Sequence, residues 1–221
     1  VVLKANGTIE KKVVGSVVEA LVADQAEPSD FARLEEIFEA PSLQMVSFTI
    51  TEKGYSIYDG KGDILPVVEQ GFKEAPEKQG HLMGRVAALC YRRFRTCGAP
   101  VALASMDNCS HNGDKLKAGV MAFVEAWVKN GIVENEFEAY MKDDTKVSFP
   151  WSMIDKITPR PDENVKAMLE KDGFEQTELI ITSRGTYTSP FVNSEETGYL
   201  VMEDAFPNGR PPLDQAGVLF T

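Results

Sequence analysis

The chain has little positive charge and few of the residues that bind metals. Its 221 residues include 23 Lys and Arg against 34 Asp and Glu, so the net charge at pH 7 is −11. Proteins that bind nucleic acid take much of their affinity from neutralising phosphates, and this charge balance argues against such a partner. Two His and three Cys, without a C-x-x-C pair, are too few for a convincing zinc site. We therefore expect no metal centre, and the odd set of cysteines favours a reducing cytoplasm.

Long hydrophobic runs are also missing. The longest, Val86–Tyr91, has six residues, whereas a helix that crosses a bilayer needs about 18. The sequence therefore predicts no membrane span. With 43% hydrophobic and 26% charged residues, the composition is that of a globular protein. The first residues, Val1–Lys4, include neither a methionine nor a signal-peptide pattern, so we expect a piece excised from a longer protein.

Apolar stretches alternate with amphipathic stretches along the first two thirds of the chain. Strands are expected where apolar and branched residues run together, at 13–18, 43–51 and 101–105. Helices are expected where apolar positions recur at helical spacing and a Gly or Pro follows, at 29–38, 76–96 and 112–130. This alternation predicts an α/β fold with a parallel sheet covered by helices on both faces.

The texture of the sequence changes after about residue 146. Seven of the twelve prolines lie in the last third, interrupted by one short helix expected near 162–171. We therefore predict a sheet domain over residues 1–148. Residues 149–221 are predicted to be a crossover and the beginning of a second, mainly helical domain.

Two of the predicted strands end in unusually polar segments. Thr51–Tyr55 follows the apolar stretch at 43–50, and the segment from Ser105 to Gly113 follows the strand at 101–104. Each segment alone reads most simply as a surface turn. Ligands of open parallel sheets bind beyond the carboxyl ends of the strands, so the two together favour a binding site. A third segment, Phe149–Pro159, is ambiguous, because Asp155 lies either in a partly dry environment or in a surface pair with Lys156.

The polar segments also carry a family resemblance. They resemble the motifs of the polyol-specific long-chain dehydrogenase family, which includes mannitol 2-dehydrogenase, fructuronate reductase and tagaturonate reductase. The matching stretches are Val13–Val17, the T-E-x-G-Y element at Thr51–Tyr55, the D-N-x-x-x-N-G element at Asp107–Gly113, the F-P-x-S-M-[VI]-D-[RK]-I-T-P signature at Phe149–Pro159, and the E-D-x-F-P-x-G-R-P element at Glu203–Pro211. The resemblance covers nearly the whole chain, from Val13 to Thr221.

The resemblance implies an NAD-dependent oxidoreductase with a Rossmann-like domain. Such an enzyme transfers a hydride between NAD and a secondary alcohol of a sugar acid or polyol, without a metal. Similarity over Thr188–Pro211 favours fructuronate and mannonate as substrates, with mannitol 2-dehydrogenase as the alternative. Neither the particular sugar nor the choice between NAD and NADP follows from these residues.

The resemblance also implies roles for individual residues. Asn108 would hold the substrate oxygen, because an amide N–H₂ donates without titrating. Asn112 is its rival, and as an expected helix N-cap it takes the structural role. Asp155 would lie beside the catalytic pocket, across a crevice from Asn108. Thr51, Glu52 and Gly54 would lie against the cofactor.

Two elements of the family are missing from these residues. The glycine-rich G-x-G-x-F-H-R turn should precede residue 1, and Gly60-Lys61-Gly62 lacks the third glycine that would replace it. The catalytic lysine should follow Thr221. We therefore expect an internal fragment of a dehydrogenase that is inactive alone. A non-catalytic α/β binding module is the alternative if the chain is complete as given.

Overall fold

The computed structural model describes residues 1–156, 158–181, 187–196 and 198–221. It divides into two compact units. The larger unit comprises residues 19–154 and 200–221, and the smaller unit comprises residues 1–18 and 155–199. This division does not follow the expected boundary after residue 148, because the chain returns to the larger unit at residue 200. The assignment of 149–221 to a second domain stays a prediction.

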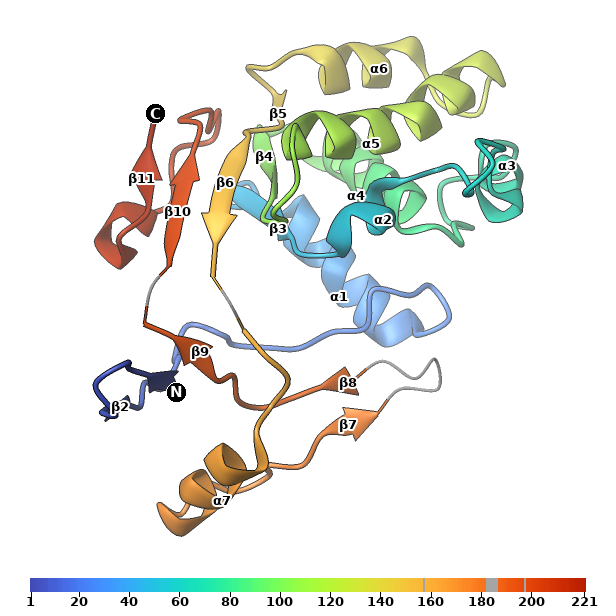
Figure 1. Ribbon diagram of the computed structural model, residues 1–221. Helices are drawn as coiled ribbons and strands as arrows, with labels where there is room; N and C mark the ends of the chain where they lie inside the picture. Colours follow the sequence, from blue (N-terminus) through green and yellow to red (C-terminus); the bar gives the residue numbers. More distant parts are fainter. Residues whose placement is uncertain (157, 182–186, 197) are drawn as a thin grey trace. The chain divides into compact units, whose positions relative to one another are not determined.

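A parallel sheet forms the centre of the larger unit (Figure 1). Its strands are β3 (Met45–Phe48), β4 (Val101–Ser105) and β5 (Val147–Ser148), in the order β3-β4-β5. Both pairings are parallel, with Phe48 opposite Ser105 and Val101 opposite Val147. Every residue of β4 is buried, as expected for a central parallel strand. The predicted α/β fold with a parallel sheet is therefore confirmed.

Helices pack on one another and on this sheet. They are α1 (Pro28–Glu39), α2 (Thr51–Tyr55), α3 (Pro66–Gly71), α4 (Leu82–Thr96), α5 (Asn112–Lys129) and α6 (Asn135–Lys142). α4 packs between α1 and α5, while α5 contacts β4 and α6 contacts β5 (Figure 1). Trp127, Phe123 and Met83 are fully buried between these helices. No helix among the described residues is long and apolar enough to cross a membrane.

Helix α4 begins later than predicted, at Leu82 rather than near Pro76. The His81 ring accepts a hydrogen bond from the Met83 N–H and so caps the helix. Before it, the buried Gln79 side chain donates to the carbonyls of Gly71 and Ala75. These contacts hold the chain before Leu82 in a loop, where a continuous helix would lose them.

Arg93 contributes more than the aliphatic stem expected of it. The whole residue is buried. Its guanidinium donates to five main-chain carbonyls, those of Phe38, Ala40, Leu43, Ala99 and Pro100. It therefore joins the end of α1 to the chain that enters β3 and β4, and these bonds replace the hydration that burial removes.

A second sheet has the strand order β11-β10-β6. These strands are β6 (Ser152–Asp155), β10 (Tyr199–Met202) and β11 (Leu219–Phe220), and the short 3₁₀ helix η1 (Leu213–Ala216) precedes β11. β10 and β11 are parallel, with Met202 opposite Phe220. The prolines of this region thus lie around short strands.

The smaller unit contains short strands and one α-helix. The strands β1 (Val2–Leu3), β2 (Ile9–Glu10) and β9 (Ser194–Glu195) form one sheet, and β7 (Ile180–Ile181) pairs with β8 (Tyr187–Thr188). Helix α7 (Glu163–Lys171) confirms the predicted short helix, and the Asp162 carboxylate caps it. The predicted strand at 13–18 is wrong. Its valines are exposed and the segment has no strand partner among the residues that the structure describes, so branching alone did not make a strand.

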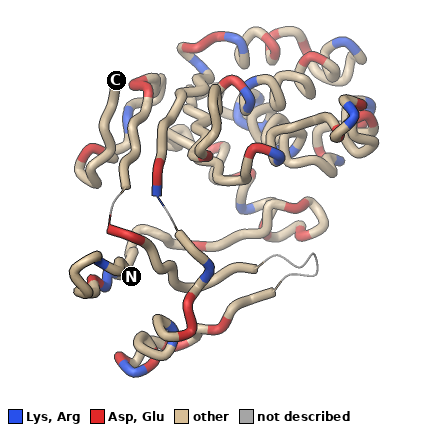
Figure 2. The backbone as a smooth tube through the Cα atoms, in the orientation of Figure 1, with Lys and Arg blue, Asp and Glu red and all other residues tan. Residues whose placement is uncertain are grey.

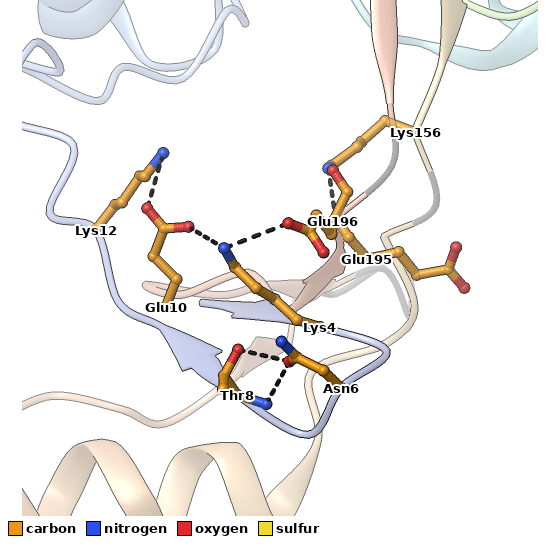
Figure 3. Close-up of polar contacts among 8 residues, drawn as sticks. All are labelled: Lys4, Asn6, Thr8, Glu10, Lys12, Lys156, Glu195 and Glu196. Carbon is orange, nitrogen blue, oxygen red and sulfur yellow. Dashed lines mark hydrogen bonds and ion pairs between the residues drawn. The ribbon is translucent and has the colours of Figure 1, made fainter.

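Charged residues of both signs are interspersed along each unit (Figure 2). In the smaller unit the Lys4 ammonium lies between two carboxylates, 3.5 Å from Glu10 and 3.3 Å from Glu196 (Figure 3). The Lys156 ammonium donates to the main-chain carbonyls of Glu195 and Glu196. These contacts connect the β1–β2 hairpin and residue 156 to the end of β9.

Candidate functional site

The two polar segments predicted to form a site follow neighbouring strands. β3 and β4 are parallel and adjacent, with Phe48 opposite Ser105. Thr51 comes three residues after Phe48, and Asn108 comes three residues after Ser105. Their placement beyond the carboxyl ends of two strands in one sheet is therefore confirmed. This edge is where open parallel sheets bind ligands.

The Asp107 carboxylate connects these two strand ends. One of its oxygens accepts the Ile50 N–H at 2.8 Å, and the other accepts the Thr51 N–H at 2.9 Å. Asp107 is buried, so the two backbone donors replace its lost hydration. Thr51 has a φ of 63°, which is rare for a branched residue. The carboxylate therefore fixes the sharp turn from β3 into α2.

Tyr55 binds the same Asp107 carboxylate and the end of β4. Its hydroxyl lies 2.7 Å from the Ser105 Oγ and donates to the Asp107 carboxylate. Burial raises the pKa of Tyr55, and the neighbouring Asp107 raises it further. The phenol therefore stays protonated as a donor at neutral pH. The T-E-x-G-Y segment is a short helix, α2, where the sequence suggested a turn, and its final tyrosine anchors it.

The Asn108 side chain differs from its neighbours because it is available. Asn108 is exposed, and within the part of the chain that the structure describes its amide makes no hydrogen bond. The next residue, Cys109, has a pKa raised by burial, which disfavours the reactive thiolate. The exposed Asn108 amide is therefore available for a hydrogen bond.

Asn112 is structural, as expected, but it is not the N-cap of α5. His111 precedes the helix in a left-handed conformation, with φ 55°, and Asn112 is the first helical residue. The buried Asn112 amide donates to the Asp107 carbonyl at 3.1 Å and to the Ser152 carbonyl and hydroxyl at 2.9 Å. The side chain is therefore committed to the strand end and to the signature segment, and only its contact with the Gly113 N–H resembles a cap.

Gly113 lets the signature segment pass close to α5. A Cβ at this position would lie 2.5 Å from the Phe149 carbonyl oxygen and 2.8 Å from the Trp151 ring. Beside it, the Asp114 carboxylate accepts from the Trp151 Nε1 at 3.2 Å, and the Trp151 ring packs edge-on against His111. The D-N-x-x-x-N-G and F-P-x-S-M elements are therefore packed together in the larger unit.

Glu52 is the one of the three residues proposed to face the cofactor that lines a groove beside α2. Glu52, Lys53 and Tyr55 line one side of a cavity of about 710 Å³, and α5 lines the other with Ala118, Gly119 and Ala122. The Thr51 and Glu52 side chains are exposed, and Glu52 pairs with Lys115 of α5. A Cβ at Gly119 would lie 2.9 Å from the Tyr55 carbonyl, so this glycine allows α2 and α5 to approach.

Asp155 lies in the smaller unit, where it is exposed. Its carboxylate has no ion pair within the described ranges, and Lys156 instead binds the main-chain carbonyls of Glu195 and Glu196. The Asp155–Lys156 surface pair is therefore not formed. The position of Asp155 across from Asn108 stays a prediction.

Sequence reasoning did not give Asp107, Tyr55 or Ser152 a role of their own. Asp107 and Tyr55 are hydrogen-bonded although they are 52 residues apart in the sequence. Asn112 and Ser152 are hydrogen-bonded although they are 40 residues apart. One signal was present: Asp107 comes two residues after a buried strand, and an acidic residue needs donors when it is buried.

Comparisons with known proteins agree with this architecture. A family model described as the mannitol dehydrogenase Rossmann domain matches residues 2–215. The chain is 50% identical over 216 residues to the D-mannonate oxidoreductase of Thermotoga maritima, covering 98% of this chain and 40% of that protein. It is 28% identical over 215 residues to the polyol:NADP oxidoreductase of Gluconobacter oxydans, covering 96% and 40%.

A solved structure gives the same result. Mannitol 2-dehydrogenase of Pseudomonas fluorescens, in a ternary complex with NAD and D-mannitol, superposes with a TM-score of 0.70 at 29% identity, over 94% of this chain and 38% of that chain. The chain therefore belongs to the mannitol dehydrogenase family, within its Rossmann domain. It spans about two fifths of the length of the curated relatives that it matches.

Proposed function

We propose that the protein is an NAD-dependent oxidoreductase that acts on a sugar acid or polyol, with fructuronate and mannonate as the preferred pair. The identity of 50% with a D-mannonate oxidoreductase supports this substrate over mannitol, whose dehydrogenases match at lower identity. Mannitol 2-dehydrogenase activity is the alternative. The match to a polyol:NADP oxidoreductase keeps NADP as a second cofactor to be tested.

The exposed Asn108 amide is the observation that carries the proposal. It follows a buried parallel strand, its own amide is unbonded within the described residues, and its neighbours Asp107 and Asn112 are committed to structure. We assign Asn108 to the substrate oxygen, where charge accumulates as a ketone is reduced. A fixed amide donor stabilises that charge without itself titrating.

The strand edge fits a nicotinamide cofactor. Thr51 and Gly54 lie where the chain leaves β3. The Tyr55 hydroxyl binds Ser105 and so anchors α2 against β4, and we propose that the cofactor approaches the backbone of α2 at this edge. The Glu52 carboxylate is exposed at the mouth of the groove. We propose that Thr51, Glu52 and Gly54 contact the cofactor, which when bound supplies or accepts the hydride.

Asp155 is proposed to orient a polar group of the substrate or nicotinamide. Its carboxylate is exposed and has no ion pair among the described residues, so it is available for this role. Under this proposal residues 1–148 bind the cofactor, and residues 149–221 lead from the sheet toward the part that encloses the substrate. Tyr55 is not a candidate acid, because its buried hydroxyl has a raised pKa and is bonded to Asp107 and Ser105.

The test is an assay of the protein expressed from its complete reading frame. We expect NADH-dependent reduction of fructuronate to exceed that of fructose. The same assay with NADPH in the same buffer tests the choice of cofactor. Asn108→Ala should lower kcat by roughly 10²–10³-fold, whereas Asn130→Ala, at the distant end of α5, should leave it unchanged.

The competing proposal is a non-catalytic α/β binding module. It predicts that NADH or a sugar acid binds in calorimetry while no keto-sugar is reduced. Absence of turnover with every keto-sugar and both cofactors would reject the oxidoreductase. Turnover that survives Asn108→Ala would keep the reaction and reject this assignment of Asn108.

A further inference from the structure

We propose that Asp107 is a positioning residue for the reaction, fixing the main chain that leads into Asn108 and the backbone of Thr51 at the strand edge. This inference rests on the proposed function. It adds a residue that itself has no free group for a ligand, since its carboxylate is occupied by the protein. Asp107 acts through its neighbours and does not touch the reacting atoms.

The carboxylate oxygens are divided between three donors. Oδ1 accepts the Thr51 N–H, while Oδ2 accepts the Ile50 N–H and the Tyr55 hydroxyl. Two successive backbone N–H groups therefore converge on one buried carboxylate. An amide cannot replace it, because one of its two atoms would be an N–H₂ donor facing another donor.

The main chain of Asp107 is held as firmly as its side chain. Its N–H donates to the Ser105 Oγ at 3.3 Å, and its carbonyl accepts from the Asn112 amide at 3.1 Å. Asn108 is the next residue, and hydrogen bonds on the N–H and the carbonyl of Asp107 therefore fix the main chain from which Asn108 projects. Binding groups that are fixed before the substrate arrives avoid reorganisation during the reaction.

The same carboxylate holds Thr51 in a conformation that it would otherwise leave. With φ at 63°, a β-branched residue is strained. Without Asp107 the Ile50 and Thr51 N–H groups lose their acceptor and the turn is free to relax. Relaxation moves the proposed cofactor contact and the substrate contact together, because the side chain of Asp107 binds Thr51 and its main chain continues into Asn108.

The experiment compares Asp107→Asn with Tyr140→Phe in the protein expressed from its complete reading frame. Tyr140→Phe is a matched control, because it removes the buried hydroxyl that donates to the Ala99 carbonyl at 2.7 Å, just before the amino end of β4. We expect Asp107→Asn to lower kcat by about 10–10²-fold and to raise the KM for NADH. Tyr140→Phe should reduce the melting temperature and leave both kinetic constants unchanged.

Equal kinetic constants for folded Asp107→Asn and wild type would overturn the inference. If Asp107→Asn does not fold, Tyr55→Phe loosens the same carboxylate while keeping both N–H bonds, and it should lower kcat by about twofold to fivefold. An unchanged kcat in folded Tyr55→Phe would then count against the proposal.

Failure of the proposed function is recognised separately. If wild type reduces no keto-sugar, amide hydrogen exchange still tests the hydrogen bonds of the Asp107 carboxylate. Asp107→Asn should lose protection at the Ile50 and Thr51 amides, while Tyr140→Phe keeps it. Unchanged protection at both amides would overturn the inference. If wild type is active, Asn108→Ala abolishes turnover and Asp107→Asn leaves the kinetic constants unchanged, the function stands and the role of Asp107 is wrong.

Discussion

Asn112 and Ser152 are joined by three hydrogen bonds. The Asn112 amide donates to the carbonyl and hydroxyl of Ser152, and the Ser152 N–H donates back to the Asn112 Oδ1 at 3.1 Å. The Ser152 hydroxyl also donates to the Ser105 carbonyl. Two family motifs are therefore joined to the end of β4 by one buried asparagine.

Replacing Asn112 should destabilise the larger unit. Asn112→Ala leaves the carbonyls of Asp107 and Ser152 without this donor in a buried site, and each unsatisfied buried group costs about 1–3 kcal/mol. We expect the free energy of unfolding to fall by at least that amount in urea denaturation. Asn130→Ala is the matched control, since its exposed side chain donates to the Phe72 carbonyl, and equal losses in the two variants would contradict the buried network.

Gly113 should not tolerate alanine. The added Cβ would lie 2.5 Å from the Phe149 carbonyl oxygen, which belongs to the backbone, so either α5 or the signature segment must move. Such overpacking typically costs about 1–3 kcal/mol, and thermal unfolding should show the loss. Gly60→Ala is the control because no atom lies within 4 Å of its added Cβ. A Gly113→Ala protein as stable as Gly60→Ala would disprove the close packing.

The sheet and the position of the site could be predicted because they depend on local patterns. The apolar run at 101–105 has the length of a buried strand, and polar residues directly after it mark the binding edge. The contacts of Asp107 could not be predicted, since its donors are brought back only when α2 folds against β4. The strand predicted at 13–18 was wrong although the local pattern was strong, because strand propensity without a partner strand does not make a strand.

Lys156 should be needed for activity although it is exposed. Its ammonium donates to two successive carbonyls, those of Glu195 and Glu196 (Figure 3). Gly198 leaves room for the Lys156 side chain, because a Cβ at position 198 would lie 2.4 Å from the Lys156 Cδ. If Asp155 takes part in the reaction, this contact holds the adjacent residue in place.

We therefore expect Lys156→Met to lower kcat/KM by about tenfold, and Lys156→Arg to retain most of it because the cation is kept. Steady-state assays of both variants decide the point. Lys12→Met serves as a control that removes a cation from the same unit, where Lys12 pairs with Glu10. A loss of the same size in Lys12→Met would indicate a general charge effect.

His81 should make the larger unit less stable as the pH falls. Burial lowers the pKa of His81 from its ordinary value of 6.5, and the nearby Arg85 lowers it further. The unfolded chain therefore takes up the proton before the folded protein does. The stabilisation is fully present above about pH 6.5, and it is lost as the pH falls through that value toward the lower pKa of the folded state. Protonation also removes the ring acceptor that caps α4 at the Met83 N–H.

His81→Asn removes this titration and keeps a capping side chain. Between pH 7.5 and 5.5 the free energy of unfolding of wild type should fall more steeply than that of His81→Asn, as measured by urea denaturation at several pH values. His111→Asn is the matched control, because His111 is exposed at the start of α5, and its profile should follow wild type. Parallel profiles for wild type and His81→Asn would show that His81 takes up its proton equally in the folded and unfolded states, and the acid sensitivity would then belong to the carboxylates.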